Sequence, residues 1–89
     1  MKYVYLLKLR NGDIYKGSTG DLRRRMEEHR LGKVESTKHF RPLSLIGYEA
    51  YQNHEDAERR ERFLKTTGGE RLLKQQYKNA ITQPYGEVA

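Results

Sequence analysis

The chain of 89 residues contains no cysteine. This absence excludes disulfides, a thiolate nucleophile and cysteine-based zinc sites. The histidines, at positions 29, 39 and 54, lack the i,i+4 spacing of paired ligands on one helix face, so we expect no structural zinc. No apolar run is long enough to cross a membrane, and the first residues alternate like a strand rather than a signal peptide. We therefore predict a cytoplasmic protein without a membrane segment.

Apolar residues are scarce at 35%, and the mean hydropathy is −1.04. Clear periodic segments nevertheless indicate a folded chain rather than a disordered one. A chain of this length has one small core, so any functional site must lie near the surface. Acidic residues are outnumbered, with 18 Lys and Arg against 12 Asp and Glu, which gives a net charge of +6 and a pI near 9.7. This balance favours a polyanionic partner.

The N-terminal segment predicts a β-hairpin. Residues 3–9 alternate, and both faces of the alternation are largely apolar, which is typical of a central strand covered on both sides. Asn11-Gly12 is a strong turn signal, and residues 14–18 return as a second strand. A two-residue loop would place Tyr5 and Tyr15 on opposite faces, whereas a three-residue loop would place them on the same face. The pattern alone allows both.

A helix follows the hairpin. Asp21 is a good N-cap, with Thr19 as the alternative, and Gly32 is a suitable end. At 100° per residue, Leu22 and Met26 form the apolar stripe, with Arg25 and His29 beside it. The flanking residues Arg23, Arg24, Glu27 and Glu28 are expected to face solvent. The three consecutive arginines are therefore not equivalent, because Arg25 alone points toward the sheet.

The remaining chain predicts one strand and two helices. Residues 32–42 read as a loop, and residues 43–51 as a third strand. Asn53 caps the next helix, whose apolar side is predicted from Ala57, Phe63 and Leu64, with Glu61 on the same side. Thr67 and Glu70 resemble a capping box for a last helix, which we expect to end near Tyr77. Residues 79–89 are predicted to be a flexible tail.

These segments together resemble the GIY-YIG nuclease family, in particular its small standalone bacterial members. The resemblance runs from about Met1 to Tyr77 and rests on YVYLL, IYKGST, DLRRRMEEH, PLSLIGYEAY and DAERRERFLK in this order. The family's first tyrosine motif matches residues 3–5, with Tyr3 in place of glycine. The second matches residues 15–17, with Lys16 in place of an aliphatic residue. Gly20 replaces a common asparagine, a change that Asp21 can tolerate as the cap.

The resemblance implies a set of catalytic residues: Tyr5, Tyr15, Arg25, His29 and Glu61. Because both tyrosines line one site in the family, it also favours the three-residue loop. The implied reaction is hydrolysis of a phosphodiester by water. Glu61 would hold Mg²⁺ (or Mn²⁺), Arg25 would stabilise charge on the phosphate, and Tyr5 would activate or position the water beside Tyr15. His29 would relay a proton or contact phosphate.

Each assignment has a structural alternative. Tyrosines in strands are usually core residues, and a phenol with a pKa near 10 is a poor base at neutral pH. Glu61 could simply pair with Lys65 at i,i+4, and His29 could close the edge of the apolar stripe. Gly17 is expected to allow a close backbone approach opposite Tyr5. Gly17 and five basic residues form the predicted nucleic-acid surface, and the basic ones read equally well as solvated charge: Arg23, Arg24, Lys33, Lys38 and Arg41.

We therefore predict an α/β (α+β) domain over residues 1–78, with a three-stranded antiparallel sheet flanked by helices in the order β-β-α-β-α-α. Its predicted activity is Mg²⁺-dependent cleavage of DNA, without an appended recognition module. Selectivity for branched, damaged or single-stranded DNA in repair or processing fits this better than cutting at one sequence. The alternative is a nucleic-acid-binding module that is non-catalytic or needs a partner protein. Nothing in the sequence distinguishes DNA from RNA, and a monomer is favoured.

Overall fold

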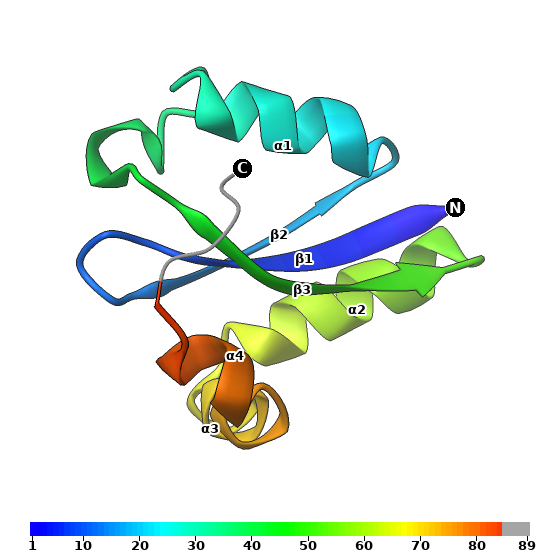
Figure 1. Ribbon diagram of the computed structural model, residues 1–89. Helices are drawn as coiled ribbons and strands as arrows, with labels where there is room; N and C mark the ends of the chain where they lie inside the picture. The colour runs from blue at the N-terminus through cyan, green and yellow to red at the C-terminus, as the bar shows by residue number, and fades with distance from the viewer. Residues whose placement is uncertain (85–89) are drawn as a thin grey trace.

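The computed structural model describes residues 1–84, which form a three-stranded antiparallel sheet with helices on both faces (Figure 1). The strands are β1 (Lys2–Lys8), β2 (Ile14–Thr19) and β3 (Ser44–Tyr51), in the order β2-β1-β3. The predicted fold class is confirmed, and the first strand lies at the centre of the sheet as its two apolar faces indicated. None of the helices formed by residues 1–84 is both long and apolar enough to cross a membrane.

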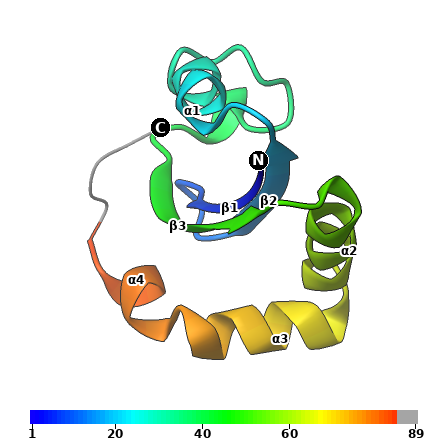
Figure 2. The same ribbon diagram turned by 90° about the vertical axis from the view of Figure 1, so that its right-hand side faces the viewer.

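The helices form two unequal layers. Helix α1 (Leu22–Arg30) covers one face of the sheet, and α2 (His54–Leu64), α3 (Thr67–Gln76) and α4 (Lys78–Thr82) lie on the opposite side (Figures 1 and 2). This division gives the sheet one face shielded by a single short helix. Of the α-helices formed by residues 1–84, only α1 therefore separates the side chains on this face from solvent.

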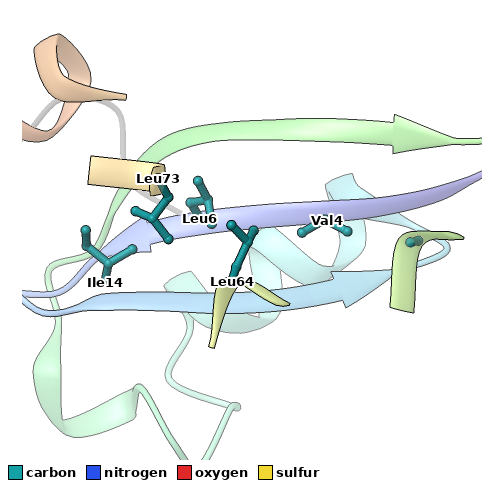
Figure 3. Packing of buried hydrophobic residues seen from close by; sticks show 6 residues of the cluster. Val4, Leu6, Ile14, Leu64 and Leu73 are labelled. Atoms are coloured by element: carbon teal, nitrogen blue, oxygen red, sulfur yellow. The ribbon is translucent and has the colours of Figure 1, made fainter. Parts of the chain in front are cut away.

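The two layers correspond to the two faces of β1. Val4 and Leu6 point toward α2 and α3 and pack with other buried residues of that side, namely Ile14, Ala57, Leu64 and Leu73 (Figure 3). Tyr5, Leu7 and Leu9 point the other way and pack with Leu43, against the α1 residues Leu22 and Met26. Each fully buried leucine contributes about 1.5–3 kcal/mol relative to an exposed one. Because its side chains alternate between the two faces, β1 thus contributes to both cores.

The hairpin loop has three residues, Arg10 to Gly12, which confirms the prediction that the resemblance favoured. Leu9 and Asp13 close it with a 2.8 Å backbone hydrogen bond, and Gly12 has φ 93°. That left-handed conformation costs little for glycine because it has no Cβ. The register then pairs Tyr5 with Gly17 and Leu7 with Tyr15, so both tyrosines lie on the α1 face.

Strand β3 contains a bulge where it passes the middle of β1. Leu6 pairs with Gly47 and Leu7 with Leu45, so Ile46 is the extra residue. The bulge lets Leu45 pack on the α1 side while Ile46 packs with the core of α2 and α3. Strand β3 can therefore contribute apolar residues to both layers.

Two predicted helix caps are confirmed. The Asp21 side chain accepts a hydrogen bond from the Arg24 backbone N–H, and that of Asn53 accepts from Glu55 and Asp56. The predicted capping box at Thr67 is wrong by one residue, because Thr66 caps α3 by accepting from Gly69.

The reason for this shift lies in how closely α3 follows α2. A Cβ at Gly69 would lie only 1.8 Å from the Phe63 carbonyl oxygen, so the glycine must occupy the turn that Thr66 caps. Glu70, the other half of the predicted box, instead pairs with Lys16 on β2. The acidic residue thus connects α3 to the sheet.

Other features differ from the sequence prediction. The 32–42 loop contains a short 3₁₀ turn, η1 (Lys38–Phe40). Phe63 is 41% exposed rather than buried with Ala57 and Leu64, since its ring faces the Arg60 guanidinium at 5.9 Å. The predicted tail, residues 79–89, overlaps α4, where Ile81 packs against the core. Residues 85–89 lie outside the part that the structure describes.

Candidate active site

Tyr5 is the centre of the cluster on the α1 face. Its side chain is fully buried, and the hydroxyl lies 2.9 Å from His29 Nε2. Arg25 donates from Nε to the same hydroxyl at 3.3 Å. Both partners come from α1, where a spacing of four residues puts them on one helix face. Arg25 therefore points toward the sheet, as predicted.

His29 is buried and neutral. Its Nδ1 lies 2.8 Å from Thr37 Oγ1, and the Thr37 side chain is also buried. Burial and, next, the positive charge of Arg25 lower the pKa of His29 to about 4. At neutral pH the ring therefore carries one N–H, which can serve only one of its two partners.

The hydrogen bonds can be satisfied in one consistent direction. Arg25 can only donate, so the Tyr5 oxygen accepts from it. The Tyr5 hydroxyl then donates to His29 Nε2, and His29 Nδ1–H donates to Thr37. We assign this tautomer from the network, because it gives the Arg25 Nε–H, the Tyr5 hydroxyl and the His29 N–H one acceptor each. A chain of hydrogen bonds thus runs from the cation on α1 to the loop after it.

Tyr5 is not ionised at neutral pH. Burial raises its pKa to about 12, and the hydrogen bond from Arg25 offsets only part of this effect. The Tyr5 phenol therefore loses its proton less readily than that of an ordinary exposed tyrosine. In this environment it acts as a hydrogen-bonding group that fixes Arg25 and His29.

Tyr15 completes an aromatic group around the same point. Its ring centroid lies 6.2 Å from that of Tyr5 and 5.4 Å from that of His29, and the His29 contact is edge-on. Tyr15 is partly exposed, whereas Tyr5 and His29 are buried. Tyr15 is therefore the aromatic member of this cluster that reaches the surface.

Gly17 makes the approach of Tyr5 to this strand possible. A Cβ at Gly17 would lie 2.5 Å from the Tyr5 hydroxyl oxygen and 2.6 Å from Cζ. No other residue type could occupy this position without displacing the Tyr5 ring. The close approach predicted for Gly17 is thus present, and it supports the hydroxyl directly.

Glu61 lies on the opposite face of the sheet, on α2. Its Oε1 accepts from the Ser18 hydroxyl at 2.5 Å, and Oε2 pairs with Lys65 at 2.9 Å. Burial alone would raise the pKa of Glu61, but hydrogen bonds from Ser18 and Lys65 outweigh it and hold the pKa below its usual range. The carboxylate is therefore ionised at neutral pH, and the Lys65 pairing considered from the sequence is present.

Glu61 and the Tyr5 cluster meet at the edge strand β2. Gly17 faces Tyr5, and the next residue, Ser18, faces Glu61, because successive strand residues point to opposite faces. No hydrogen bond within residues 1–84 joins Glu61 to Arg25 directly. The two halves of the predicted site therefore lie on either side of one strand edge rather than in one closed pocket.

A cation at Glu61 would depend on few protein ligands. Within residues 1–84 there is no group of three or more His, Asp or Glu side chains that could enclose a metal ion. Mg²⁺ commonly binds through one or two carboxylates, with waters and phosphate oxygens completing its octahedron. An ionised, half-buried carboxylate at an open edge fits this type of site.

The predicted basic surface divides into two groups. Arg41 donates from Nη1 to the Arg30 carbonyl and from Nε to that of Lys38, so it serves the end of α1. Lys38 pairs with Glu35. The other three members are exposed on or just after α1: Arg23, Arg24 and Lys33.

Sequence reasoning missed Thr37 and Ser18. Thr37 belongs to a segment without periodicity, so no sequence signal indicates that it reaches His29. Ser18 could have been found, because the alternation that points Gly17 toward Tyr5 must point Ser18 toward the other layer. Both residues hold a predicted site residue in place.

Comparisons with known proteins identify the family to which the chain is similar. The family model for the GIY-YIG catalytic domain matches residues 1–79. A UPF0213 protein of Clostridium perfringens is 33% identical over 66 residues, covering 73% of this chain and 71% of that protein. A UPF0213 protein of Staphylococcus haemolyticus is 34% identical over 73 residues, covering 81% and 89%.

A solved structure is similar as well. The solution NMR structure of the UPF0213 protein BH0048 from Bacillus halodurans matches with a TM-score of 0.57 and 26% identity, over 94% of this chain and all of that chain. The family model covers nearly the whole domain, and the relatives cover most of it. The chain therefore belongs to the GIY-YIG family, whose catalytic domain is a nuclease fold that generally uses divalent metal ions.

Proposed function

We propose that this protein is an endonuclease that hydrolyses DNA phosphodiester bonds with the help of Mg²⁺ or Mn²⁺. The observation that carries the proposal is the edge of β2, where Arg25 and Tyr5 lie on one side of Gly17 and ionised Glu61 lies beyond Ser18. A phosphodiester along this edge would meet a cation on one side and a carboxylate suited to a metal ion on the other. Both forms of charge stabilisation accelerate phosphodiester hydrolysis.

Glu61 is the residue that would hold the metal ion. Ser18 fixes one carboxylate oxygen, and Lys65 is an exposed partner that can leave the other. When bound, Mg²⁺ supplies positive charge to the phosphate oxygens and lowers the pKa of a coordinated water. The protein's part is to present one ionised oxygen at the open edge with little reorganisation.

Arg25 is the residue that would stabilise charge on the phosphate. Its guanidinium is oriented by Tyr5 at Nε and by Glu28 at Nη1, at 3.3 Å and 3.0 Å. A guanidinium has five N–H donors, so others remain for phosphate oxygens. Lysine could not keep both orienting contacts and still bind the phosphate bidentately.

Tyr5 and His29 are proposed to act as positioning residues. Tyr5 keeps its proton because its pKa is raised to about 12. The low pKa of His29, about 4, makes its ring a weak base, and its acceptor nitrogen Nε2 is already bound by the Tyr5 hydroxyl, so neither group is ready to take a proton from water at neutral pH. Their hydrogen bonds hold Arg25 from behind through the chain that ends at Thr37. Tyr15, as the partly exposed ring of the cluster, is proposed to contact the substrate or the attacking water.

The exposed arginines on α1 are proposed to position the nucleic-acid backbone. Contacts of this kind give affinity and register without reading sequence. We therefore propose selectivity for branched, damaged or single-stranded DNA, in repair or processing. Robust cleavage at one defined duplex sequence would contradict this part of the proposal.

A nicking assay on labelled single-stranded, duplex and branched DNA tests the activity. Wild type with Mg²⁺ or EDTA is compared with Glu61→Ala and Arg25→Ala. Arg59→Ala is the matched control, since it removes an exposed α2 arginine whose partner is Asp56. We expect metal-dependent cutting that is lost in both site variants and kept in the control. RNA versions of the same substrates define the nucleic-acid type.

Two outcomes would contradict the proposal. If wild type binds these DNAs but cuts none, the protein is a binding module or needs a partner that delivers the substrate. If cutting survives both site substitutions, the site is wrongly assigned or the activity comes from a contaminant.

A further inference from the structure

A second open site lies on the α1 face, next to the N-terminal half of α1. It is a groove of about 1040 Å³ between α1 and the strands β1 and β3, lined by Tyr3 and Tyr48 together with the α1 residues Leu22, Arg23 and Met26. None of these residues contributes a hydrogen bond to the Arg25–Tyr5–His29 chain.

The two tyrosines reach this groove because of the sheet register. Tyr48 pairs with Tyr5, so its side chain points to the α1 face of the sheet. It is nevertheless 54% exposed. Its ring meets that of Tyr3 edge-on, with centroids 6.1 Å apart. One aromatic ring therefore supports a second ring that presents its surface to solvent.

The groove and the proposed active site occupy different flanks of α1. Arg23 and Arg25 are two residues apart, which separates their side chains by about 200° around the helix. Arg25 points to Tyr5 on one flank, whereas Arg23 lines the groove on the other. Gly20 and Asp21, which connect β2 to α1, also line the groove. The groove is thus continuous with the chain segment that leads directly from Gly17.

The chemistry of the groove fits an unpaired nucleobase. An exposed aromatic ring with apolar neighbours offers a stacking surface that any base can use. Arg23 at the same groove can contact the phosphate of that nucleotide. The Asp21 carboxylate disfavours phosphate at its end of the groove and can accept from an exocyclic amino group of a base. Duplex DNA keeps its base faces stacked, so only unpaired nucleotides can use the ring.

We propose that Tyr48, supported by Tyr3, is a base-stacking subsite for single-stranded nucleic acid, with Arg23 holding the adjacent phosphate. The inference rests on the proposed function, because it names the part of the substrate that this second site takes. The net charge of +6 favours a polyanionic partner for the chain as a whole, and the exposed Arg23 supplies positive charge at this groove. An unpaired segment stacked here leads around the N-terminal end of α1 toward the edge of β2.

Fluorescence anisotropy in EDTA tests this without any cleavage. The probes are a labelled dodecamer of thymidines, an abasic dodecamer of equal charge, and a duplex of equal length. The variants are Tyr48→Ala, Tyr48→Leu and Tyr48→Phe, with Phe63→Ala as an exposed aromatic control on α2. We expect Tyr48→Ala and Tyr48→Leu to bind the thymidine dodecamer at least about 5-fold more weakly. Tyr48→Phe and Phe63→Ala should bind within about twofold of wild type. The first keeps an aromatic ring at position 48, and the second leaves Tyr48 unchanged.

The abasic and salt-dependence measurements separate the ring from the charge. The abasic dodecamer should bind wild type and Tyr48→Ala equally, since it has no base to stack. Arg23→Ala should lower the slope of log affinity against log salt by about 0.7 for a single strand. Thermal melts followed by circular dichroism establish that each variant is folded. Tyr48→Leu keeps an apolar strand residue, which tests the ring even if alanine destabilises β3.

Specific outcomes would overturn the inference. Equal binding of the thymidine dodecamer by wild type, Tyr48→Ala and Tyr48→Leu would do so, as would wild type binding the abasic strand as tightly as the thymidine strand. Sedimentation showing self-association that depends on Tyr48 would identify the groove as an interface between copies. Because binding is measured in EDTA, these results are independent of whether the protein cleaves DNA.

Discussion

The substitution Gly17→Ala tests the site with the addition of a single methyl group. The new Cβ would lie 2.5 Å from the Tyr5 hydroxyl oxygen, 2.6 Å from Tyr5 Cζ and 3.0 Å from Tyr15 Cε2. Ordinary carbon contacts lie near 3.5–4.0 Å. The Tyr5 ring must therefore move by about 1 Å, because both sides of the sheet at this point are packed. The backbone conformation itself imposes no penalty, since Gly17 does not have a positive φ.

The cost follows from what this movement breaks. Overpacking a core position costs about 1–3 kcal/mol. Moving the Tyr5 hydroxyl also weakens its hydrogen bonds with His29 and Arg25. A buried polar atom left without a partner costs about 1–3 kcal/mol. We therefore expect the free energy of unfolding to fall by about 2–4 kcal/mol, a large share of the stability of a small domain.

The assay is urea denaturation followed by circular dichroism, together with single-turnover nicking of the DNA substrate that wild type prefers. Nicking is measured without urea, at a temperature where the variant is still folded. We expect its rate to fall more than tenfold, because Arg25 loses its orienting partner. Gly68→Ala, on α3, is the matched control: it adds the same methyl group where no atom lies within 4 Å. If Gly17→Ala matches Gly68→Ala in stability and in rate, the account of the Tyr5 contact is wrong.

Three further predictions concern Glu61, His29 and the residues that bind them. Lys65→Ala should lower the Mg²⁺ concentration needed for half-maximal nicking, because Lys65 occupies Glu61 Oε2; an unchanged or higher requirement in the titration would contradict this. Thr37→Val should lower the free energy of unfolding by about 1–3 kcal/mol in urea melts and slow nicking, by leaving His29 Nδ1–H unpaired, whereas Thr37→Ser should retain both. The folded-state pKa of His29, about 4, lies below its unfolded value, so its contribution is complete above about pH 6.5 and is lost as the pH falls toward 4. The free energy of unfolding from urea melts should therefore fall by up to about 3 kcal/mol between pH 6.5 and pH 4. Its dependence on pH should be flatter in His29→Gln; equal pH dependence in both proteins would refute the assignment.

Local chemistry was enough to predict most elements of the fold. Asp21 and Asn53 cap their helices by the hydrogen bonds that their residue types favour. The two apolar faces of residues 3–9 placed this strand at the centre of the sheet. The start of α3 was harder to predict from the sequence, because it depends on the close packing of Gly69 against the Phe63 carbonyl. That contact joins two helices and has no signature in the propensity of either residue.

The same distinction applies to the candidate site. Helical periodicity alone directed Arg25 and His29 toward the sheet, and the structure places both on Tyr5. The Thr37 contact depends on how the loop after α1 folds back, which periodicity does not encode. The pKa values of Tyr5 and His29 depend on burial by the whole layer. Sequence can therefore indicate which side chains meet, but not the protonation state in which they meet.

The position of the site depends on the parity of the hairpin loop. With the three-residue loop, Gly17 lies opposite Tyr5, and the neighbouring Ser18 turns to the other face, where it donates to Glu61. A loop shorter by one residue would place Ser18 opposite Tyr5, and would turn Tyr15 away from it. The left-handed residue of this loop, Gly12, thus helps decide whether the cation side and the carboxylate side share one strand edge. The Asn11-Gly12 turn lies at the far end of the hairpin, but it sets the register that positions the residues of the proposed site.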